Sequence, residues 1–400
     1  MPRKGFIPID YSALPVRRVG IGMLGYGFMG KVHSNAFLKI PYSFDTPPAW
    51  PVLVAMCGRN EAKVVDVAGR FGYRGTYTEW KRMLADPDVE IFDNCTPDDR
   101  HAKPSIAAAA AGKHVICEKP LAMTVRDAAA MVEAVEKAGV KHMTCFNYRF
   151  LPAVRLARQL IDQGALGKIY HFRGCYLQEP GHNPAAPLED CWYATGTRSG
   201  ILLGIGSHII DMSRFLVGEI TSVSGLVRTW NTTRVDKTGA VQPVRADEGN
   251  LALVEFANGA AGTLESSGVA TGRKNQHTWE INGSKASLRW DLEDPNHLWV
   301  YSDEAMPPGT ASGLRQVRGF ASVSVTDAGH PLQTIYLPTG HNAGWEYGHV
   351  HALHHFVDSV VNGKPVAPFG ATFEDGYRCQ VIMEAIEKSS RTGRRIELKY

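Results

Sequence analysis

The residue whose setting most favours chemistry is Lys119. It lies between Glu118 and Pro120, directly after the apolar run His114–Cys117. In open α/β folds ligands bind beyond the carboxyl ends of the strands, and a lysine amine placed there can take up or release a proton. The tripeptide alone also fits a surface lysine before a structural proline, so both interpretations stay open at this point.

A second candidate for chemistry is His208, in the segment Gly204–Asp211, where a loop enters an apolar helix. Imidazole is the side chain most often used for proton transfer in enzymes. A histidine beside apolar residues is equally compatible with a hydrogen-bonded position in the core. His208 therefore becomes a candidate for catalysis only together with other motifs.

A glycine motif near the start of the chain predicts a dinucleotide site. The pattern G-x-G-x-x-G follows the β-type run Val19–Leu24 and opens a predicted helix. Its first glycine permits a tight turn, the second lets the backbone approach a pyrophosphate, and the third lets helix and sheet pack closely. The helix N-terminus attracts the phosphate charge. The residues predicted to form this part of the site are Gly25, Gly27, Phe28, Met29 and Gly30. A glycine-rich turn without a ligand is the alternative.

The residues that would select the cofactor are less decisive. The second predicted strand ends in Cys57-Gly58-Arg59, without the acidic residue that binds an NAD ribose. Arg59 could pair with a 2′-phosphate, stack on adenine or stay solvated, so NAD(H) is favoured and NADP(H) is possible. Thr96 and Pro97 follow the fourth strand and His101 opens the next helix. Each of these three is predicted to contact the cofactor, with a cap or turn as the alternative.

The elements that must position these residues form two patterns. Residues 16–146 alternate short apolar runs with helical segments, which predicts a doubly wound parallel sheet of the Rossmann type. The predicted strands are Val19–Leu24, Val52–Met56, Ile91–Cys95, His114–Cys117 and His142–Phe146, and the helices include Glu61–Arg70, Ser105–Ala111 and Val125–Ala138. We expect a nucleotide-binding domain over 1–150.

Beyond residue 150 the pattern changes. One helix, Ala153–Asp162, precedes alternating strands that turn signals such as Ala257-Asn258-Gly259 join. These strands include Ile169–Tyr176, Ser222–Trp230, Leu251–Phe256, Ala261–Ser266 and Ala286–Trp290, and helices return at His351–Val361 and Phe373–Ser389. Residues 151–400 are therefore expected to form an α+β domain with antiparallel hairpins; the family resemblance described below further implies a large open, mostly antiparallel sheet that serves substrate binding and oligomerisation.

The bulk properties exclude several classes of protein. The chain has 400 residues and a formal net charge of +3 from 43 basic and 40 acidic residues, without basic blocks. This charge pattern offers no footprint for nucleic acid or an anionic membrane. No apolar run approaches the roughly 20 residues of a membrane span. The seven scattered cysteines are typical of reduced thiols rather than disulfides. We expect a cytoplasmic enzyme.

Taken together, these motifs resemble the Gfo/Idh/MocA family. The glycine motif, Glu118-Lys119-Pro120 after a fifth strand, and G-S-H-x-x-D at Gly206–Asp211 carry the resemblance, which extends over almost the whole chain. Further segments are similar to the branch of levoglucosan and glycoside 3-dehydrogenases: Gly181–Trp192, Arg273–Asn275, Glu280–Gly283, Pro338–His341 and Phe373–Gly376. The resemblance implies an oxidoreductase that exchanges a hydride between a nicotinamide cofactor and a secondary alcohol of a sugar, glycoside or polyol, with C3 of a glycoside as one candidate position.

The resemblance also assigns roles to individual residues. It implies that Lys119 and His208 are catalytic and contact the substrate, and that the molecule is a homodimer or homotetramer. The cofactor contacts that it implies are Glu118, Lys119, Asn147 and Arg149, and the further substrate contacts are Tyr148, Gln178, Trp192 and His341. No metal is expected, because His351 and His355, although four residues apart, lack the glutamate of a zinc-protease motif.

One position departs from the family pattern. Where the family commonly has an aspartate four residues before the histidine, this chain has Gly204, which can neither accept a proton nor orient an imidazole through a side chain. Glu179, Glu189 or Asp190 could supply a carboxylate instead. The departure keeps two alternatives open: a glycosidase-like enzyme that retains its NAD and works by transient oxidation and elimination, and a non-catalytic sensor of sugar or NAD.

Overall fold

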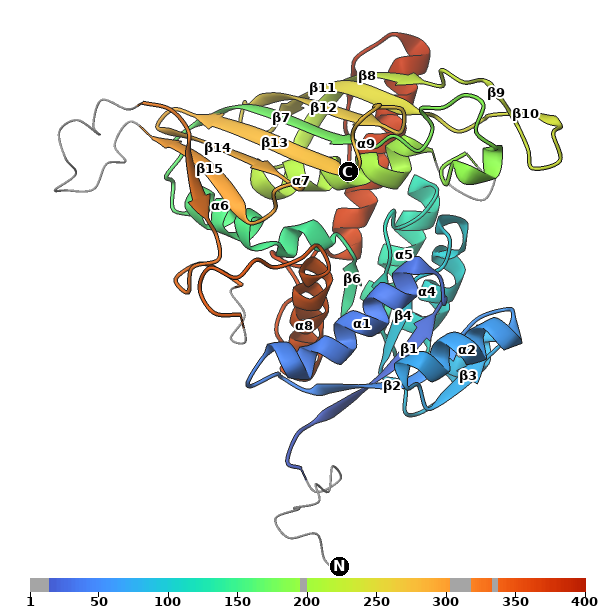
Figure 1. Cartoon of the computed structure of the whole chain (residues 1–400). Helices are drawn as coiled ribbons and strands as arrows, with labels where there is room; N and C mark the ends of the chain where they lie inside the picture. The colour runs from blue at the N-terminus through green and yellow to red at the C-terminus, as the bar shows by residue number, and fades with distance from the viewer. Residues whose placement is uncertain (1–13, 195–199, 303–317, 333–336) are drawn as a thin grey trace, which may run out of the picture.

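A parallel sheet organises the N-terminal part of the chain (Figure 1). The computed structural model describes residues 14–194, 200–302, 318–332 and 337–400. Six strands pair in the order β3-β2-β1-β4-β5-β6, all parallel. They are β1 Arg18–Leu24, β2 Trp50–Cys57, β3 Gly75–Tyr77, β4 Ile91–Asn94, β5 His114–Cys117 and β6 His142–Thr144. This order and the covering helices confirm the predicted doubly wound α/β domain.

The helices of this domain begin and end where local chemistry dictates. They are α1 Phe28–Ser43, α2 Glu61–Phe71, α3 Trp80–Leu84, α4 Ala102–Ala110 and α5 Val125–Ala138. The α5 helix starts at Thr124, whose side chain accepts a hydrogen bond from the Asp127 backbone N–H, and ends at Gly139 with φ of 65°. Such caps fix the ends of the helices and hence the loops at the carboxyl edge of the sheet.

A second, larger sheet forms the C-terminal part. Nine strands pair in the order β16-β15-β14-β13-β7-β12-β11-β8-β17, and among them only β7 and β12 are parallel. The strands are β7 Ile169–Leu177, β8 Ile220–Arg228, β11 Gly249–Phe256, β12 Ala261–Ser267, β13 Gln276–Gly283, β14 Ala286–Asp291, β15 His297–Ser302, β16 Ala321–Ser324 and β17 Ile396–Glu397. A short separate ribbon pairs β9 Thr233–Val235 with β10 Val241–Pro243. The predicted open, mostly antiparallel sheet is confirmed.

Helices cover one face of the second sheet and leave the other open (Figure 1). On the covered side lie α6 Pro152–Asp162, α7 Ser207–Leu216 and α9 Phe373–Thr392. Along β11 the side chains alternate, so that Ala252 and Val254 are buried whereas Leu251 and Leu253 are exposed. This period of two is typical of a strand with one solvated face.

The last helices return to the first domain. The helix α8 Tyr347–Val361 lies beside α1, and its Leu353 and Phe356 share a buried core with Ile21 and Phe37 (Figure 1). The boundary at 150/151 stays a prediction, with residues 1–13 of the first part outside the described residues. Because α8 follows the second sheet in the sequence but packs in the core of the first domain, it connects the two parts of the chain.

Two features bear on the setting of the chain. None of the helices within the described residues is both long and apolar enough to cross a membrane. All seven cysteines are free thiols, as the scattered spacing predicted, and all but Cys175 are buried.

Candidate active site

The glycine loop has the geometry that the motif predicts. Gly25, directly after β1, has φ of +109°, and its N–H donates to the Cys57 carbonyl oxygen at 2.9 Å. A Cβ on Gly30 would lie 2.1 Å from the Gly25 carbonyl oxygen. At Gly27, where α1 begins, a Cβ would meet nothing within 4 Å. Gly25 and Gly30 are thus required by the turn and the packing, whereas Gly27 borders open space that a ligand's phosphates could approach.

The two glycines provide a matched test. We expect Gly30→Ala to destabilise the protein by about 2 kcal/mol, because the added methyl group overpacks the turn. We expect Gly27→Ala to leave the unfolding transition unchanged but to raise the Kd for NADH about tenfold. A tenfold change corresponds to the loss of roughly one charge-assisted hydrogen bond to the phosphates. Urea unfolding and fluorescence titration of NADH check the two expectations. Equal effects of both substitutions would contradict the assignment.

Five other predicted cofactor residues lie in or around this loop. Phe28 is 70% exposed and stacks on Trp345, with ring centroids 6.0 Å apart. Met29 packs against the core of the first domain. Arg59 is exposed just after β2, and the Thr96 hydroxyl donates to the Asn94 side-chain oxygen at 2.7 Å. Pro97 is exposed and precedes the short helix Asp98–Arg100. All of these remain compatible with a cofactor lying along the strand ends.

His101 has a different place from the predicted one. Its ring is buried, and the two nitrogens lie 2.7 Å from the Pro120 carbonyl oxygen and 3.0 Å from the Thr96 carbonyl oxygen. Two carbonyl acceptors require both N–H groups. Burial disfavours the charge, but Cys117, Asp98 and the Pro120 carbonyl together raise the pKa of His101 to about 10. Because both nitrogens are occupied, His101 holds two loops together rather than contacting a cofactor through its ring.

Arg149 also differs from the prediction. Its side chain is 3% exposed, and its guanidinium donates to the two carboxylate oxygens of Asp211 at 2.9 and 2.5 Å. A further carboxylate, Asp375, lies 3.4 Å away, and the Phe215 ring lies beneath. A bidentate buried pair of this kind fixes both partners in space. Arg149 therefore anchors the segment 147–150 to α7 through Nε and Nη2, which the carboxylates engage.

The two predicted chemical residues meet between the domains. The Lys119 ammonium donates to the Gly204 carbonyl oxygen at 2.8 Å, in the π-helical turn Leu202–Gly206 that precedes α7. His208, in the first turn of α7, is 7% exposed and its ring lies 4.7 Å from the Tyr148 ring. Burial, and then the positive charge of Lys119, hold the pKa of His208 well below its usual value of 6.5. His208 is thus neutral at neutral pH and can accept a proton.

A chain of polar groups lies beside the His208 ring and continues onto the second sheet. Trp345 donates its indole N–H to the Tyr148 hydroxyl oxygen at 3.1 Å, and the Tyr148 and Tyr176 oxygens are 2.8 Å apart. The Tyr176 hydroxyl donates to the Asn275 side-chain oxygen at 2.8 Å, and Gln178 donates to the same oxygen at 2.7 Å. From Trp345 to Asn275 the donations run in one direction, so the Tyr148 oxygen accepts from Trp345 and its hydroxyl donates to Tyr176. Two predicted substrate residues, Tyr148 and Gln178, belong to this chain.

The other predicted residues are placed less decisively. Asn147 is buried, and among the described residues its side-chain N–H₂ has no hydrogen-bond partner, which leaves a donor for a ligand. Trp192 is half-buried against the core of the second domain. His341 is exposed and hydrogen-bonds the Pro338 carbonyl. Within the described part of the chain, no contact joins Trp192 or His341 to Lys119.

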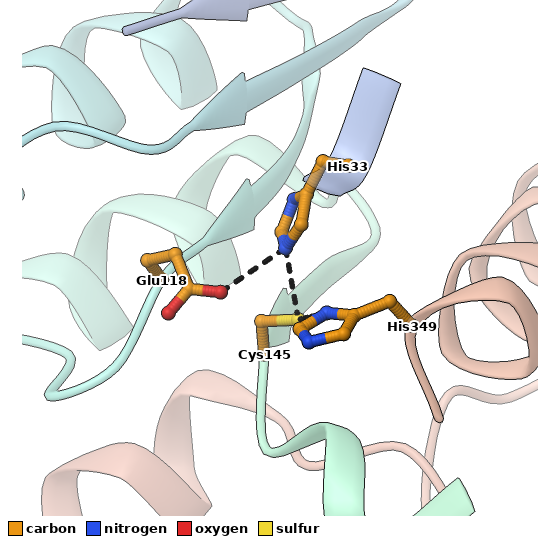
Figure 2. Close-up of side chains that lie close together, drawn as sticks. All are labelled: His33, Glu118, Cys145 and His349. Carbon is orange, nitrogen blue, oxygen red and sulfur yellow. Dashed lines mark hydrogen bonds and ion pairs between the residues drawn. The ribbon is translucent and has the colours of Figure 1, made fainter. Parts of the chain in front are cut away.

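The carboxylate of Glu118 turns away from solvent into a buried network (Figure 2). His33, from α1, lies between two carboxylates, with Nδ1 2.8 Å from Asp93 and Nε2 3.1 Å from Glu118. The second Glu118 oxygen accepts the Lys119 backbone N–H at 3.2 Å. Burial opposes ionisation here, but His33 lowers the pKa of Glu118 to about 2, and Asp93 and neighbouring thiols raise that of His33 well above 6.5. Glu118 therefore orients the backbone of Lys119 and faces His33, and its contact with a cofactor stays a prediction.

The same cluster has the composition of a metal site. His33, Glu118, Cys145 and His349 each present one ligand atom, and these atoms lie within 4.8 Å of one another (Figure 2). A thiolate is the form of cysteine that binds metals, but burial raises the pKa of Cys145 to about 12. The His33 nitrogens are already satisfied by two carboxylates. A hydrogen-bonded ion network accounts for these contacts without a metal.

The histidines singled out in the sequence form no such cluster. The Nδ1 atom of His351 hydrogen-bonds the Phe150 carbonyl at 3.1 Å, and Nε2 of His355 hydrogen-bonds the Val366 carbonyl at 2.8 Å. Each ring thus holds a different backbone segment against α8. That no metal binds remains a prediction.

Comparison with known proteins decides the family. Residues 19–146 match the oxidoreductase family with an NAD-binding Rossmann fold, and residues 154–289 match the GFO/IDH/MocA C-terminal domain. The chain belongs to the Gfo/Idh/MocA family. It is similar to levoglucosan dehydrogenase of Pseudarthrobacter phenanthrenivorans, with 37% identity over 94% of this chain and 97% of that protein. D-glucoside 3-dehydrogenase of Escherichia coli is 25% identical over 86% of this chain and 90% of that protein.

The solved structures agree. Levoglucosan dehydrogenase in complex with NADH superposes with a TM-score of 0.88 and 35% identity, over 96% of this chain and all of that chain (100%). This Gfo/Idh/MocA protein is an NAD-dependent oxidoreductase that acts on CH–OH groups. The predicted family, branch and NAD cofactor are confirmed.

The buried network makes a pH-dependent contribution to stability. Because the pKa of His33 is raised in the folded protein, the stability that its charged form contributes is fully present below about pH 6.5. This stability is lost as the pH rises through the folded pKa of His33. Because the pKa of Glu118 is lowered in the folded protein, the stability that its carboxylate contributes is fully present above about pH 4.5. This stability is lost as the pH falls toward 2. We expect His33→Gln to cost about 2 kcal/mol, most of all between about pH 4.5 and 6.5. Urea unfolding at several pH values measures this difference, and one that grew steadily above pH 8 would contradict the charge assignment.

Sequence reasoning missed several members of this Gfo/Idh/MocA site. His33 follows Gly30 by three residues and shares the buried side of α1 with Phe37, which could have indicated a buried polar group. Asp93 is an acid inside an otherwise apolar strand, which requires a partner. Tyr176 carries no local signal that distinguishes it from other strand aromatics, because its role depends on partners far along the chain.

Proposed function

We propose that the chain oxidises a secondary alcohol of a sugar or glycoside, with NAD⁺ as the hydride acceptor. The observation that carries the proposal is the meeting of Lys119 and a neutral His208 between the domains, next to the polar chain from Tyr148 to Gln178. The residues fit the cofactor, since Gly27 borders open space and the Asn147 amide offers an unpartnered donor. When bound, the nicotinamide ring supplies the hydride acceptor.

The residues divide the remaining work. The substrate C–H carbon loses a hydride and its hydroxyl loses a proton, which leaves a ketone. We assign the uptake of that proton to Lys119 and the orientation of the hydroxyl to neutral His208. The polar chain around Tyr148 and Gln178 offers further hydrogen bonds to neighbouring hydroxyls, the groups that distinguish a sugar from a simple alcohol.

The names of the relatives narrow the substrate. Levoglucosan is an anhydrosugar, and D-glucoside 3-dehydrogenase acts on a glycoside. We therefore propose an anhydrosugar or glycoside, oxidised at C3. Retained NAD with elimination, or a sensor without turnover, gains no support from these relatives.

A spectrophotometric screen at 340 nm tests the proposal. NAD and NADP are offered separately with monosaccharides, anhydrosugars, inositols and O- and C-glycosides. Reduction of NAD with anhydrosugars or glycosides, and characterisation of the product as a 3-ketone, is the expected result. Binding of NADH without reduction by any of these substrates would reject the dehydrogenase and favour the sensor or the retained-cofactor enzyme.

We further propose that the open face of the second sheet pairs with a second copy of the chain. On this face Leu226, Leu251 and Leu253 are 39%, 46% and 64% exposed, and they line a groove of about 860 Å³. Exposed apolar patches of this kind mark interaction surfaces. Sedimentation analysis should give a dimer or tetramer, and Leu253→Glu should shift it toward the monomer. A monomeric wild type would exclude the pairing.

We also propose a cytoplasmic location. All seven cysteines are free, which suits a reducing compartment. Cell fractionation with an antibody against the chain tests this, and recovery outside the cytoplasm would reject it.

A further inference from the structure

The Lys119 ammonium has an unusual hydrogen-bond partner for a proton-transfer group. Its Nζ donates to the backbone carbonyl oxygen of Gly204 at 2.8 Å. Gly204 is buried and lies within the π-helical turn Leu202–Gly206. A glycine contributes no side chain, so the partner of the ammonium is a neutral dipole rather than a carboxylate.

The turn that presents this carbonyl is itself held in place. Asp247 accepts the Leu202 backbone N–H at 2.8 Å, and its own carbonyl oxygen accepts the Ile201 N–H at 3.1 Å. A Cβ on Gly200 would lie 1.9 Å from the Asp247 carboxylate, so the chain enters the turn through a close contact. Asp247 therefore fixes the start of the turn, and π-helical turns often mark functional sites in helices.

No acid of the neighbouring loop takes the place of a side chain at Gly204. Glu179 accepts the Gly272 N–H at 2.6 Å and pairs with Lys274. Glu189 accepts the Lys237 backbone N–H, and Asp190 forms an ion pair with the Lys237 ammonium. The prediction that one of these three carboxylates serves the site is therefore not supported by their contacts.

Among the described residues, three other titratable groups act electrostatically on or with Lys119. Glu118, on the same strand edge, is ionised and hydrogen-bonds His33, and the Lys119 charge also helps to lower its pKa. His208 from α7 and His349 from α8 both have pKa values held below 6.5 by burial, and the Lys119 charge adds to this. Both imidazoles are therefore neutral near pH 7, and neither adds a negative charge.

We propose that the Gly204 carbonyl is the positioning group of Lys119, and that it holds the side chain with a neutral dipole so that Lys119 alone takes the substrate proton. This inference rests on the proposed dehydrogenase function. A dipole orients the ammonium without the full Coulomb attraction of a carboxylate.

The test places an acid at this position. In Gly204→Asp a carboxylate would favour the ammonium form of Lys119, so the rising limb of kcat/KM for oxidation should move up by about one pH unit or more. At a fixed pH within that limb, kcat/KM of Gly204→Asp should be about tenfold lower than kcat/KM of the matched neutral variant Gly204→Asn. The pH midpoint of the kcat/KM profile of Gly204→Asn should coincide with that of the wild type, even if its kcat is lower. Equal displacement of both variants, or none in Gly204→Asp, would overturn the proposal.

A second measurement decides the case if Gly204→Asp does not fold. A crystal structure of the wild-type protein should place Lys119 Nζ within 3.5 Å of the Gly204 carbonyl oxygen, and a longer separation would overturn the proposal. The two levels of inference fail differently. A wild type that reduces no NAD rejects the proposed function, whereas an active wild type with an unmoved Gly204→Asp profile rejects only the role of Gly204.

Discussion

Replacing Lys119 with methionine is expected to lower kcat by about 10³-fold while NADH binding stays unchanged. Methionine keeps the length of the side chain but removes the group that takes the substrate proton, and proton transfer by a positioned side chain contributes roughly 10²–10⁴-fold to a rate. The Lys119 ammonium contacts the Gly204 carbonyl and not the core, so its loss should leave the fold intact. Lys119→Arg should be as inactive, because arginine keeps the charge but does not deprotonate.

Three measurements make this expectation specific. Stopped-assay kcat, NADH titration and thermal unfolding are compared for wild type, Lys119→Met, Lys119→Arg and Lys137→Met, where Lys137 is an exposed lysine in the last turn of α5. Only the two Lys119 variants should lose turnover. An active Lys119→Arg would assign Lys119 an electrostatic role in place of proton transfer, and an active Lys119→Met would reject both roles.

The fold of the first domain could be predicted because its information is local. The predicted helix Val125–Ala138 has the same bounds in the structure, since Thr124 and Gly139 cap it. The strand Gly75–Tyr77 was missed because it has only three residues, none of them buried. Short, partly exposed strands lack the apolar run on which the prediction relies.

The α+β class of the second domain could be predicted from the sequence, but the order of the strands in its sheet could not. The strand Gln276–Gly283 was missed because its polar side chains hide the alternation, and Asn282-Gly283 indicates a turn although both residues are still paired with β7. The order of nine strands depends on pairings between segments far apart in the sequence. Hydrophobic pattern fixes which face a residue takes but not which strand lies beside it.

The candidate site was predictable where chemistry is local. Lys119 and His208 were each identified from their own motif, and the Lys119 charge acts on the His208 imidazole. Whether a polar side chain faces a ligand or a buried partner depends on a distant residue, and Asp211 lies 62 residues from Arg149. The same reason applies to His101, whose acceptors are two backbone carbonyls.

Asp211→Ala is expected to destabilise the protein by about 3–5 kcal/mol, the largest effect on stability that we predict. The pair that Asp211 forms with Arg149 is 2–3% exposed, and removing one member of a buried pair leaves the other charge uncompensated. Asp375 can compensate only in part, because it lies 3.4 Å from Arg149 and also pairs with Arg214. The urea midpoint should fall accordingly, since the slope of the transition stays unchanged.

The matched control is Asp66→Ala, which removes an exposed pair with Arg70 on α2 and should cost at most about 0.5 kcal/mol. The double variant Arg149→Leu/Asp211→Leu should be more stable than Asp211→Ala, because apolar side chains avoid the desolvation that the pair suffers. If the double variant instead lost stability equal to the sum of the two single variants, the side chains would not be coupled, and the expected contribution of the pair would be rejected. Because α7 carries both Asp211 and His208, the pair also sets the position of the imidazole, and kcat of the double variant should fall even where its stability recovers.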